Sequence, residues 1–283
     1  MTSSRVTLAL LGLAMLSCGS KGSAPVPDTT TKTTPADKVY TFESTPYWAD
    51  EFNSGAKPDT SKWGYDIGGD GWGNHELEYY TNASNADISN GNLNINLRKE
   101  KFGNNNYTSA RLFSKGTTGN FTYGRFEVRA KLPAGKGTWP AIWMLPTDYV
   151  YGGWPKSGEI DIMEHVGYDP TNIHITVHTD AYNHTIGTQK SAEMKVPTAL
   201  TDFHVYRVDW TPTAITGYID DTLVFTFKNE GTGSAAWPFD KRFHLMLNLA
   251  YGGDWGGAQG VDDSVLPATM QVDYVRVYRV NNL

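Results

Sequence analysis

A period-two alternation of apolar and polar residues recurs from about residue 40 to the C-terminus, and it constrains the fold more than any other feature. In the segment 123–132, Phe126, Val128 and Ala130 alternate with charged residues. Because side chains of a β-strand point alternately to opposite faces, this pattern indicates half-buried strands. Further segments of this kind are 90–100, 172–180, 204–210, 215–227, 243–251 and 271–280. No window of a dozen residues has a sustained helical stripe.

The connections between these predicted strands are rich in turn-forming residues. Clusters of Gly, Asn, Asp and Pro separate the alternating segments, and Asp220–Asp221 is predicted at the bend of a tight hairpin. The strands are evenly spread and show no repeat, which favours a single domain. We therefore predict an all-β fold, with two antiparallel sheets packed as a jelly-roll sandwich over residues 41–283.

The N-terminal residues have the composition of an export signal. An apolar run extends from Val6 to Leu16, and the only cysteine, Cys18, stands where the run ends. The run is too short to cross a membrane as a mature helix. It resembles a bacterial lipoprotein signal, so we predict a signal peptide over residues 1–18 with lipidation of Cys18. The alternative is ordinary cleavage near Ser17 or Ser20.

Residues 19–40 are rich in Thr, Pro and Ser and have almost no large apolar side chain, which predicts a flexible tether. We expect an outer-membrane or cell-surface lipoprotein that contacts the membrane only through its lipid anchor. With ordinary cleavage, the protein would be periplasmic or secreted. A single cysteine leaves the domain without a disulfide, so its stability must come from the core and from any bound ion.

The charge and composition exclude one class of function. A net charge of −6 and a pI near 5.6 argue against nucleic-acid binding, which requires a basic surface. Nothing in the sequence requires a second copy of the chain, so we expect a monomer. The nine Trp and sixteen Tyr residues serve either as core filling or as flat rings that stack on a ligand.

The segment Gly158–Gly167, GEIDIMEHVG, places three carboxylates on an otherwise apolar strand. Glu159 and Asp161 share one face of a regular strand, whereas Glu164 has the opposite parity. A charged carboxylate on a buried strand is costly unless it is paired or lies in a cleft. Three such groups within six residues therefore indicate a functional role.

A pair of carboxyl groups is what the hydrolysis of a glycosidic bond requires. A retaining enzyme places them about 5–5.5 Å apart, one as nucleophile and the other as acid and base. A β-bulge inserts one extra residue into a strand and returns later side chains to the original face. We therefore predict a bulge at Ile162–Met163 that turns Glu159, Asp161 and Glu164 toward one groove.

This segment resembles the catalytic signature Glu-x-Asp-x-x-Glu of glycoside hydrolase family 16, in the bulged form of laminarinases; the unbulged lichenases lack the extra residue. The resemblance to bacterial endo-β-1,3-glucanases covers nearly all of 47–278. The other segments that carry it are DEFN (Asp50–Asn53), GWGNHELEYYT (Gly71–Thr81), Gly124–Pro146, LMLNLAYGGDWGG (Leu245–Gly257) and VDYVRVY (Val272–Tyr278).

The resemblance implies a concanavalin A-like sandwich with a concave substrate cleft and no cofactor for catalysis. It implies that Glu159 is the nucleophile, that Glu164 is the general acid and then the base, and that Asp161 hydrogen-bonds and tunes the nucleophile. Physical chemistry agrees with this division, because negative neighbours and partial desolvation would keep a proton on Glu164.

The substrate-binding residues implied by the resemblance are aromatic and polar side chains. Trp139 and Trp143 are four residues apart on a strand and therefore share a face. The full set is Arg111, Trp139, Trp143, Trp154, His178, Asn248 and Asn74. Each of these residues also has an alternative role. Trp139 and Trp143 could serve in core packing, and Arg111 could form a surface salt bridge. His178 and Asn248 could be core polar groups with satisfied hydrogen bonds.

A structural calcium ion is a further expectation from the resemblance. The matching positions are the main-chain carbonyls of Glu51 and Gly91 and the carboxylate of Asp273. Oxygen ligands suit a hard cation. The alternative for Asp273 is a hydrogen-bonding acid at the start of a strand.

Three functions remain open at this point. The leading hypothesis is an endo-β-1,3-glucanase that depolymerises laminarin-type glucans. The second keeps the fold and the acids but acts on mixed-linkage β-1,3-1,4-glucan or on a galactan such as agar. The third is a lectin-like glycan binder without catalysis, since a fold does not determine a function; such a binder would not need three acids together.

Overall fold

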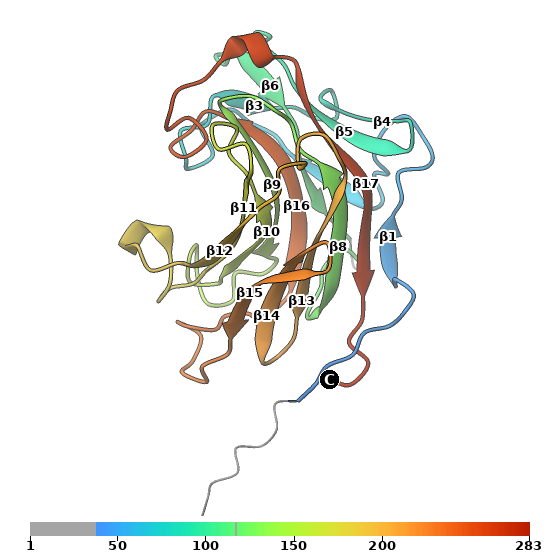
Figure 1. Cartoon of the computed structure of the whole chain (residues 1–283), viewed down its shortest axis with the longest axis vertical. Helices are drawn as coiled ribbons and strands as arrows, with labels where there is room; N and C mark the ends of the chain where they lie inside the picture. The colour runs from blue at the N-terminus through green and yellow to red at the C-terminus, as the bar shows by residue number, and fades with distance from the viewer. Residues whose placement is uncertain (1–37, 117) are drawn as a thin grey trace, which may run out of the picture. The chain divides into compact units, whose positions relative to one another are not determined.

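Two antiparallel sheets pack face to face in the computed structural model, which describes residues 38–116 and 118–283 (Figure 1). In strand order, one sheet contains β15 (Thr222–Lys228), β14 (Ala214–Ile219), β13 (His204–Trp210), β8 (Gly124–Lys131), β17 (Ala268–Tyr278), β5 (Asn92–Leu97) and β4 (Ala86–Ser89), with β1 (Trp48–Asp50) paired to β17. The other contains β12 (Lys190–Lys195), β11 (Asn172–His178), β10 (Glu159–Glu164), β9 (Thr138–Pro146), β16 (Phe243–Tyr251), β7 (Arg111–Ser114) and β2 (Trp63–Asp66).

The remaining elements are short. β3 (Glu78–Tyr80) pairs in parallel with β6 (Tyr107–Ser109), and two 3₁₀ helices span His184–Ile186 and Asp263–Val265. Neither has the length or hydropathy of a membrane span, and the described part of the chain contains no other helix. The predicted signal peptide (1–18) and all but the last residues of the predicted tether (19–40) lie outside the described residues.

The hydrophobic core lies between the two sheets and is built by alternate residues of each strand. Along β8 the burial alternates without interruption, with Phe126, Val128 and Ala130 fully buried. Ile142 and Met144 of β9 meet them from the opposite sheet as members of the same core. The period-two pattern of the sequence is thus the pattern of burial, and the predicted two-sheet sandwich is confirmed.

The predicted hairpin is also confirmed. Ile219 pairs with Thr222 across a two-residue turn, and Asp220 has a left-handed backbone with a φ of 52°. Aspartate tolerates this conformation better than most residues do. Residues Val39–Leu283 form one compact unit.

Strand β10 contains the predicted bulge. On the β11 side, Asp161 pairs with Thr176 and Glu164 with His174, so three steps along β10 match two along β11. On the β9 side the register also shifts, between Asp161 and Met163. The extra residue restores Glu164 to the face of Glu159 and Asp161, as predicted.

Candidate active site

The face of the seven-stranded sheet that points away from the core carries the predicted site, and we call it the open face. Cross-strand partners share a face of a sheet, so the register identifies its members. One row across the sheet is His174, Glu164, Ala141, Asn248, Arg111 and Asp66. The next row includes Thr176, Asp161, Trp143 and Met246. Polar and aromatic side chains dominate these rows, whereas the opposite face is apolar.

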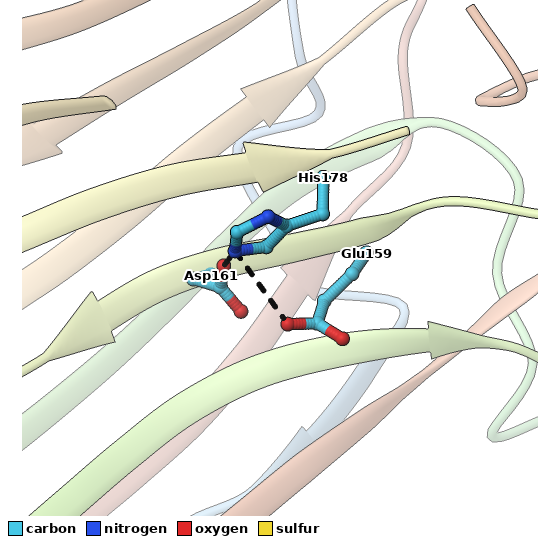
Figure 2. A group of neighbouring side chains, drawn as sticks. All are labelled: Glu159, Asp161 and His178. Carbon is cyan, nitrogen blue, oxygen red and sulfur yellow. Dashed lines mark ion pairs between the residues drawn. The ribbon is translucent and has the colours of Figure 1, made fainter. Parts of the chain in front are cut away.

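The bulge and the preceding turn place Glu159 and Asp161 against His178 of β11. Gly158 enters β10 with a φ of 87°, and a Cβ there would lie 2.8 Å from Pro238, so glycine suits this position. His178 Nε2 lies 3.5 Å from Asp161 Oδ2 and 4.0 Å from Glu159 Oε1. Figure 2 shows the three side chains converging from β10 and β11.

Each of the two glutamates accepts a hydrogen bond from a tryptophan. Trp154 Nε1 donates to Glu159 Oε2 at 2.8 Å, and Trp139 Nε1 donates to Glu164 Oε1 at 3.1 Å. Asp161 is 2% exposed and hydrogen-bonds the Glu159 carboxylate. These contacts hold the carboxyl groups in defined orientations on the open face.

Burial raises the pKa of all three acids, but the neighbours of each acid shift its pKa by a different amount. Desolvation raises the pKa of Glu159 to about 7, against the hydrogen bonds from Trp154 and Asp161 and the charge of Arg111, which lower it. Desolvation and the charge of Glu159 raise the pKa of Glu164 to about 8. Desolvation and both neighbouring carboxylates raise the pKa of Asp161 well above its usual range. Glu159 therefore ionises before Glu164.

The histidine beside the acids is neutral. Burial lowers the pKa of His178 to about 4, and the charge of His184 adds to this effect. Its ring lies 5.9 Å from Trp154 and 5.2 Å from His184 between centroids. His178 is therefore part of the site, 6% exposed, and contacts the acids as an uncharged group.

A second group of predicted residues lies on β9, β16 and β7. Trp143 Nε1 donates to Asn248 Oδ1 at 2.7 Å, and the Arg111 guanidinium lies 4.7 Å from the Trp143 ring centroid. Arg111 also lies 4.7 Å from the ring of Trp72 and pairs with Asp66 at 3.0 Å. Arg111 is buried, so its ion pair with Asp66 is not the surface salt bridge of the alternative, and it occurs together with stacking on two aromatic rings.

The sequence analysis did not predict three residues next to the site: Glu76, Tyr80 and Trp255. Glu76 accepts a hydrogen bond from Asn74, which was predicted, at 3.2 Å and a second one from Tyr80 at 2.8 Å. Trp255 packs edge-on against Trp139. The acid Glu76 lies within the segment 71–81 that carried the resemblance, but only tertiary contacts show that it joins Asn248 through Tyr80.

The predicted calcium positions lie at or beside strands of the other sheet. Asp273 is on β17, Glu51 directly follows β1, and Gly91 is in the turn between β4 and β5. Both β1 and β5 pair with β17. Asp273 is not at a strand start: β17 begins at Ala268, and a bulge separates Val272 from Tyr274. Two carbonyls and one carboxylate fit a hard cation, with the Arg129 ion pair to Asp273 as the competing interaction.

The model for "Glycosyl hydrolases family 16" matches residues 73–276. The chain is 56% identical over 241 residues to a beta-glucanase of Rhodothermus marinus, covering 82% of this chain and 84% of that protein. The X-ray structure of the laminarinase from Rhodothermus marinus superposes with a TM-score of 0.82 at 52% identity, covering 86% and 99% of the two chains. SCLam, a non-specific endo-beta-1,3(4)-glucanase, superposes with a TM-score of 0.79 at 46% identity, covering 85% and 91%.

Proposed function

Because the chain belongs to glycosyl hydrolases family 16, we propose that it is an endo-acting, retaining β-1,3-glucanase that hydrolyses laminarin-type β-glucans. The observation that carries the mechanism is the bulge of β10, which brings Glu159, Asp161 and Glu164 to one face. Two desolvated carboxyl groups with different pKa values, here Glu159 and Glu164, are the arrangement that double displacement at a glycosidic carbon requires.

In the first step, ionised Glu159 attacks the anomeric carbon while Glu164 gives its proton to the departing glycosidic oxygen. The carbon–oxygen bond to the leaving sugar breaks as the ester bond to Glu159 forms. Hydrogen bonds from Trp154 and Asp161 favour the ionised form of Glu159. The higher pKa of Glu164 keeps its proton available near neutral pH.

In the second step, Glu164 acts as a base. Having lost its proton, it takes one from a water molecule, whose oxygen attacks the same carbon and releases Glu159. Two inversions at one carbon give net retention of configuration. The same side chain therefore acts first as acid and then as base.

The aromatic side chains of the open face provide the sugar platform. Trp139 and Trp143 present rings beside the acids, and Trp154, 37% exposed, lies at the nucleophile. Sugar rings have apolar faces that pack on such surfaces, while Arg111, Asn248, Asn74 and His178 supply polar contacts.

Mixed-linkage β-1,3-1,4-glucan is the second candidate substrate. It is supported by the similarity to SCLam, which is described as non-specific toward β-1,3(4)-glucan. The two substrates share the anomeric chemistry, and they differ in the shape of the glucan chain that the loops must accept. A galactan such as agar remains the third candidate.

Product analysis tests the proposal. The purified protein is incubated with laminarin, curdlan, lichenan and agarose, and the oligosaccharides are identified by size. We expect rapid, internal cleavage of laminarin. Proton NMR should show the β-anomer first; initial release of the α-anomer would contradict the double displacement.

The same assay separates the enzyme from a glycan-binding protein. A lectin would bind laminarin without releasing reducing ends, and Glu159→Ala would leave its behaviour unchanged. For the proposed enzyme, Glu159→Ala abolishes release of reducing ends. A wild-type protein that releases none from any β-glucan would favour the lectin.

We also propose that the protein is an exported, monomeric lipoprotein anchored through Cys18, and that a calcium ion binds at Glu51, Gly91 and Asp273. The apolar run before the cysteine and the composition of the tether support the anchor. Cys18→Ala should move the protein from the membrane fraction to the soluble fraction. An unchanged distribution would argue against the anchor.

A further inference from the structure

A pair of buried carboxyl groups, Glu76 and Glu78, lies beside the end of β16, apart from Glu159, Asp161 and Glu164. Glu76 is 7% exposed and Glu78 is fully buried, whereas Leu77 between them is exposed. The backbone is extended here, since Glu76 bridges Gly252 and Glu78 begins β3. Their side chains therefore point to the same side, and Glu78 hydrogen-bonds Glu76.

The hydrogen-bond inventory of this pair requires a proton. Glu76 accepts from Asn74 Nδ2 and from the Tyr80 hydroxyl, and Glu78 Oε2 accepts from the Tyr251 backbone N–H at 2.7 Å. The other oxygen of Glu78, Oε1, is buried and has no donor among the described residues. Ionised carboxylates only accept hydrogen bonds, so two of them in contact here would leave a buried repulsion. One proton on Glu78 converts that contact into a donated hydrogen bond.

A directional chain of hydrogen bonds leads from this pair to the open face. Trp143 Nε1 donates to Asn248 Oδ1 at 2.7 Å, Asn248 Nδ2 donates to the Tyr80 hydroxyl at 3.1 Å, and Tyr80 donates to Glu76 Oε2 at 2.8 Å. In each of the three hydrogen bonds the acceptor lies nearer to Glu76 along the chain than the donor does, so all three have the same direction. The chain ends at Trp143, the cross-strand partner of Asp161.

We propose that Glu78 is a positioning residue that acts as a neutral hydrogen-bond donor to Glu76 and thereby orients Trp143 for substrate binding. Burial, together with the charge of Glu76, raises the pKa of Glu78 well above its usual range, in agreement with this role. The inference rests on the proposed function, because Trp143 is the sugar platform of that proposal.

Either carboxyl group could hold the proton of the pair and donate it to the other. Glu76 already accepts hydrogen bonds from Asn74 and Tyr80, whereas Glu78 accepts one from the Tyr251 backbone. The negative charge is therefore better stabilised on Glu76, which places the proton on Glu78. A Glu76 carboxylate also keeps accepting from Tyr80, so the hydrogen-bond chain to Trp143 keeps its direction.

Two isosteric substitutions two residues apart give opposite expectations. In Glu78→Gln the amide NH₂ replaces the donated proton and the amide oxygen still accepts from Tyr251, so KM for laminarin should stay within about twofold. In Glu76→Gln the amide oxygen can accept from only one of the two donors, Tyr80 and Asn74, and the NH₂ group faces the other. KM should rise about tenfold, the size expected for one lost hydrogen bond to a charged group, with a smaller change in kcat. Glu78→Ala, which removes both hydrogen bonds, should behave like Glu76→Gln.

Equal loss of affinity in Glu78→Gln and Glu76→Gln, or no loss in Glu76→Gln, would overturn the proposal. A second measurement needs neither a glucan nor a folded Glu76→Gln protein. The infrared difference spectrum between wild type and Glu78→Gln at neutral pH should contain the carbonyl stretch of a protonated carboxyl group. Its absence would show that Glu78 is ionised and would overturn the proposal even if laminarin is not the substrate.

Discussion

At Glu159 and Glu164 the same desolvation acts on two carboxyl groups, and their neighbours give them different chemistry. Glu159 receives hydrogen bonds from Trp154 and Asp161, which favour its charge. Glu164 receives one from Trp139 and lies in the field of Glu159, which disfavours its charge. This order of pKa values agrees with the proposed assignment of Glu159 as nucleophile and Glu164 as acid.

Replacing the nucleophile should abolish turnover without abolishing binding. Glu159→Ala removes the group that forms the covalent intermediate, so we expect kcat to fall by about 10⁴-fold or more. Affinity for laminarin oligosaccharides, measured by calorimetry, should remain because the aromatic platform is intact. Activity within tenfold of wild type would contradict the assignment of Glu159.

The pH profile of kcat/KM should be bell-shaped and narrow. Activity requires Glu159 without its proton and Glu164 with it, so activity falls as pH drops below about 7 and as it rises above about 8. Because the two acids interact, the apparent pKa of each limb is a property of the pair and not of a single residue. Glu164→Gln, assayed on a glucoside with a good leaving group, should lose the alkaline limb; retention of that limb would assign it to another residue.

At the scale of the element, one extra residue in β10 decides which way the Glu164 side chain points. Ile162 and Met163 are both fully buried, while Glu159 and Glu164 at the two ends of the strand remain partly exposed. A strand without the bulge would turn Glu164 toward the core. The bulge therefore affects the proposed catalysis by setting the direction of the Glu164 side chain.

Changing the length of β10 tests this directly. Deleting Ile162 leaves Glu159, Asp161 and Glu164 in unbroken alternation, so the acids stay on the open face and hydrolysis remains measurable. We expect a stability loss of about 1–3 kcal/mol, because a buried side chain leaves the core. Complete loss of hydrolysis in a deletion variant that still melts cooperatively, measured by reducing-end release and thermal melting, would show that residue spacing does not set the direction of Glu164.

At the scale of the whole molecule, one sheet carries the proposed active site and the other closes the core. The open face belongs to the seven-stranded sheet, and the predicted calcium positions lie on or beside strands β17, β1 and β5 of the eight-stranded sheet. The catalytic acids also affect the stability of the whole domain, because burying ionisable groups favours their neutral forms in the folded state.

Calcium should raise the melting temperature without changing catalysis. An ion that binds only the folded protein stabilises it by mass action. We expect a higher Tm with excess calcium than with a chelator, unchanged KM for laminarin, and loss of the difference in Asp273→Asn. Identical melting in both conditions would contradict a calcium site.

The acids should make the domain less stable as pH rises. The folded-state pKa values of Glu159 and Glu164, about 7 and about 8, lie above the ordinary value of 4.5. Between about pH 4.5 and 8 the folded state therefore binds more protons than the unfolded state, and the free energy of unfolding decreases with pH. Relative to wild type, Glu164→Gln should gain stability from pH 5 to pH 8 in urea titrations. A difference independent of pH would contradict the raised pKa.

The common direction of Glu159, Asp161 and Glu164 was predictable because its signal is local. The wrong parity of Glu164 has one simple remedy, a bulge, and period two places Trp139 and Trp143 on one face. The environment of each acid was less predictable. Trp139 as the donor to Glu164 and Trp154 as the donor to Glu159 depend on indole orientations that no spacing encodes.

What the sequence determined by itself is the alternation of the strands, the turns between them and the clustering of three acids on one strand, since these properties depend on neighbours along the chain. Only the tertiary structure decided the partners of Glu76 and Glu78. Their hydrogen bonds reach Tyr80 on β3, Tyr251 and Asn248 on β16, and through them Trp143 on β9. Whether a buried carboxyl group is charged depends on the atoms packed around it, and those atoms come from segments far apart in the chain.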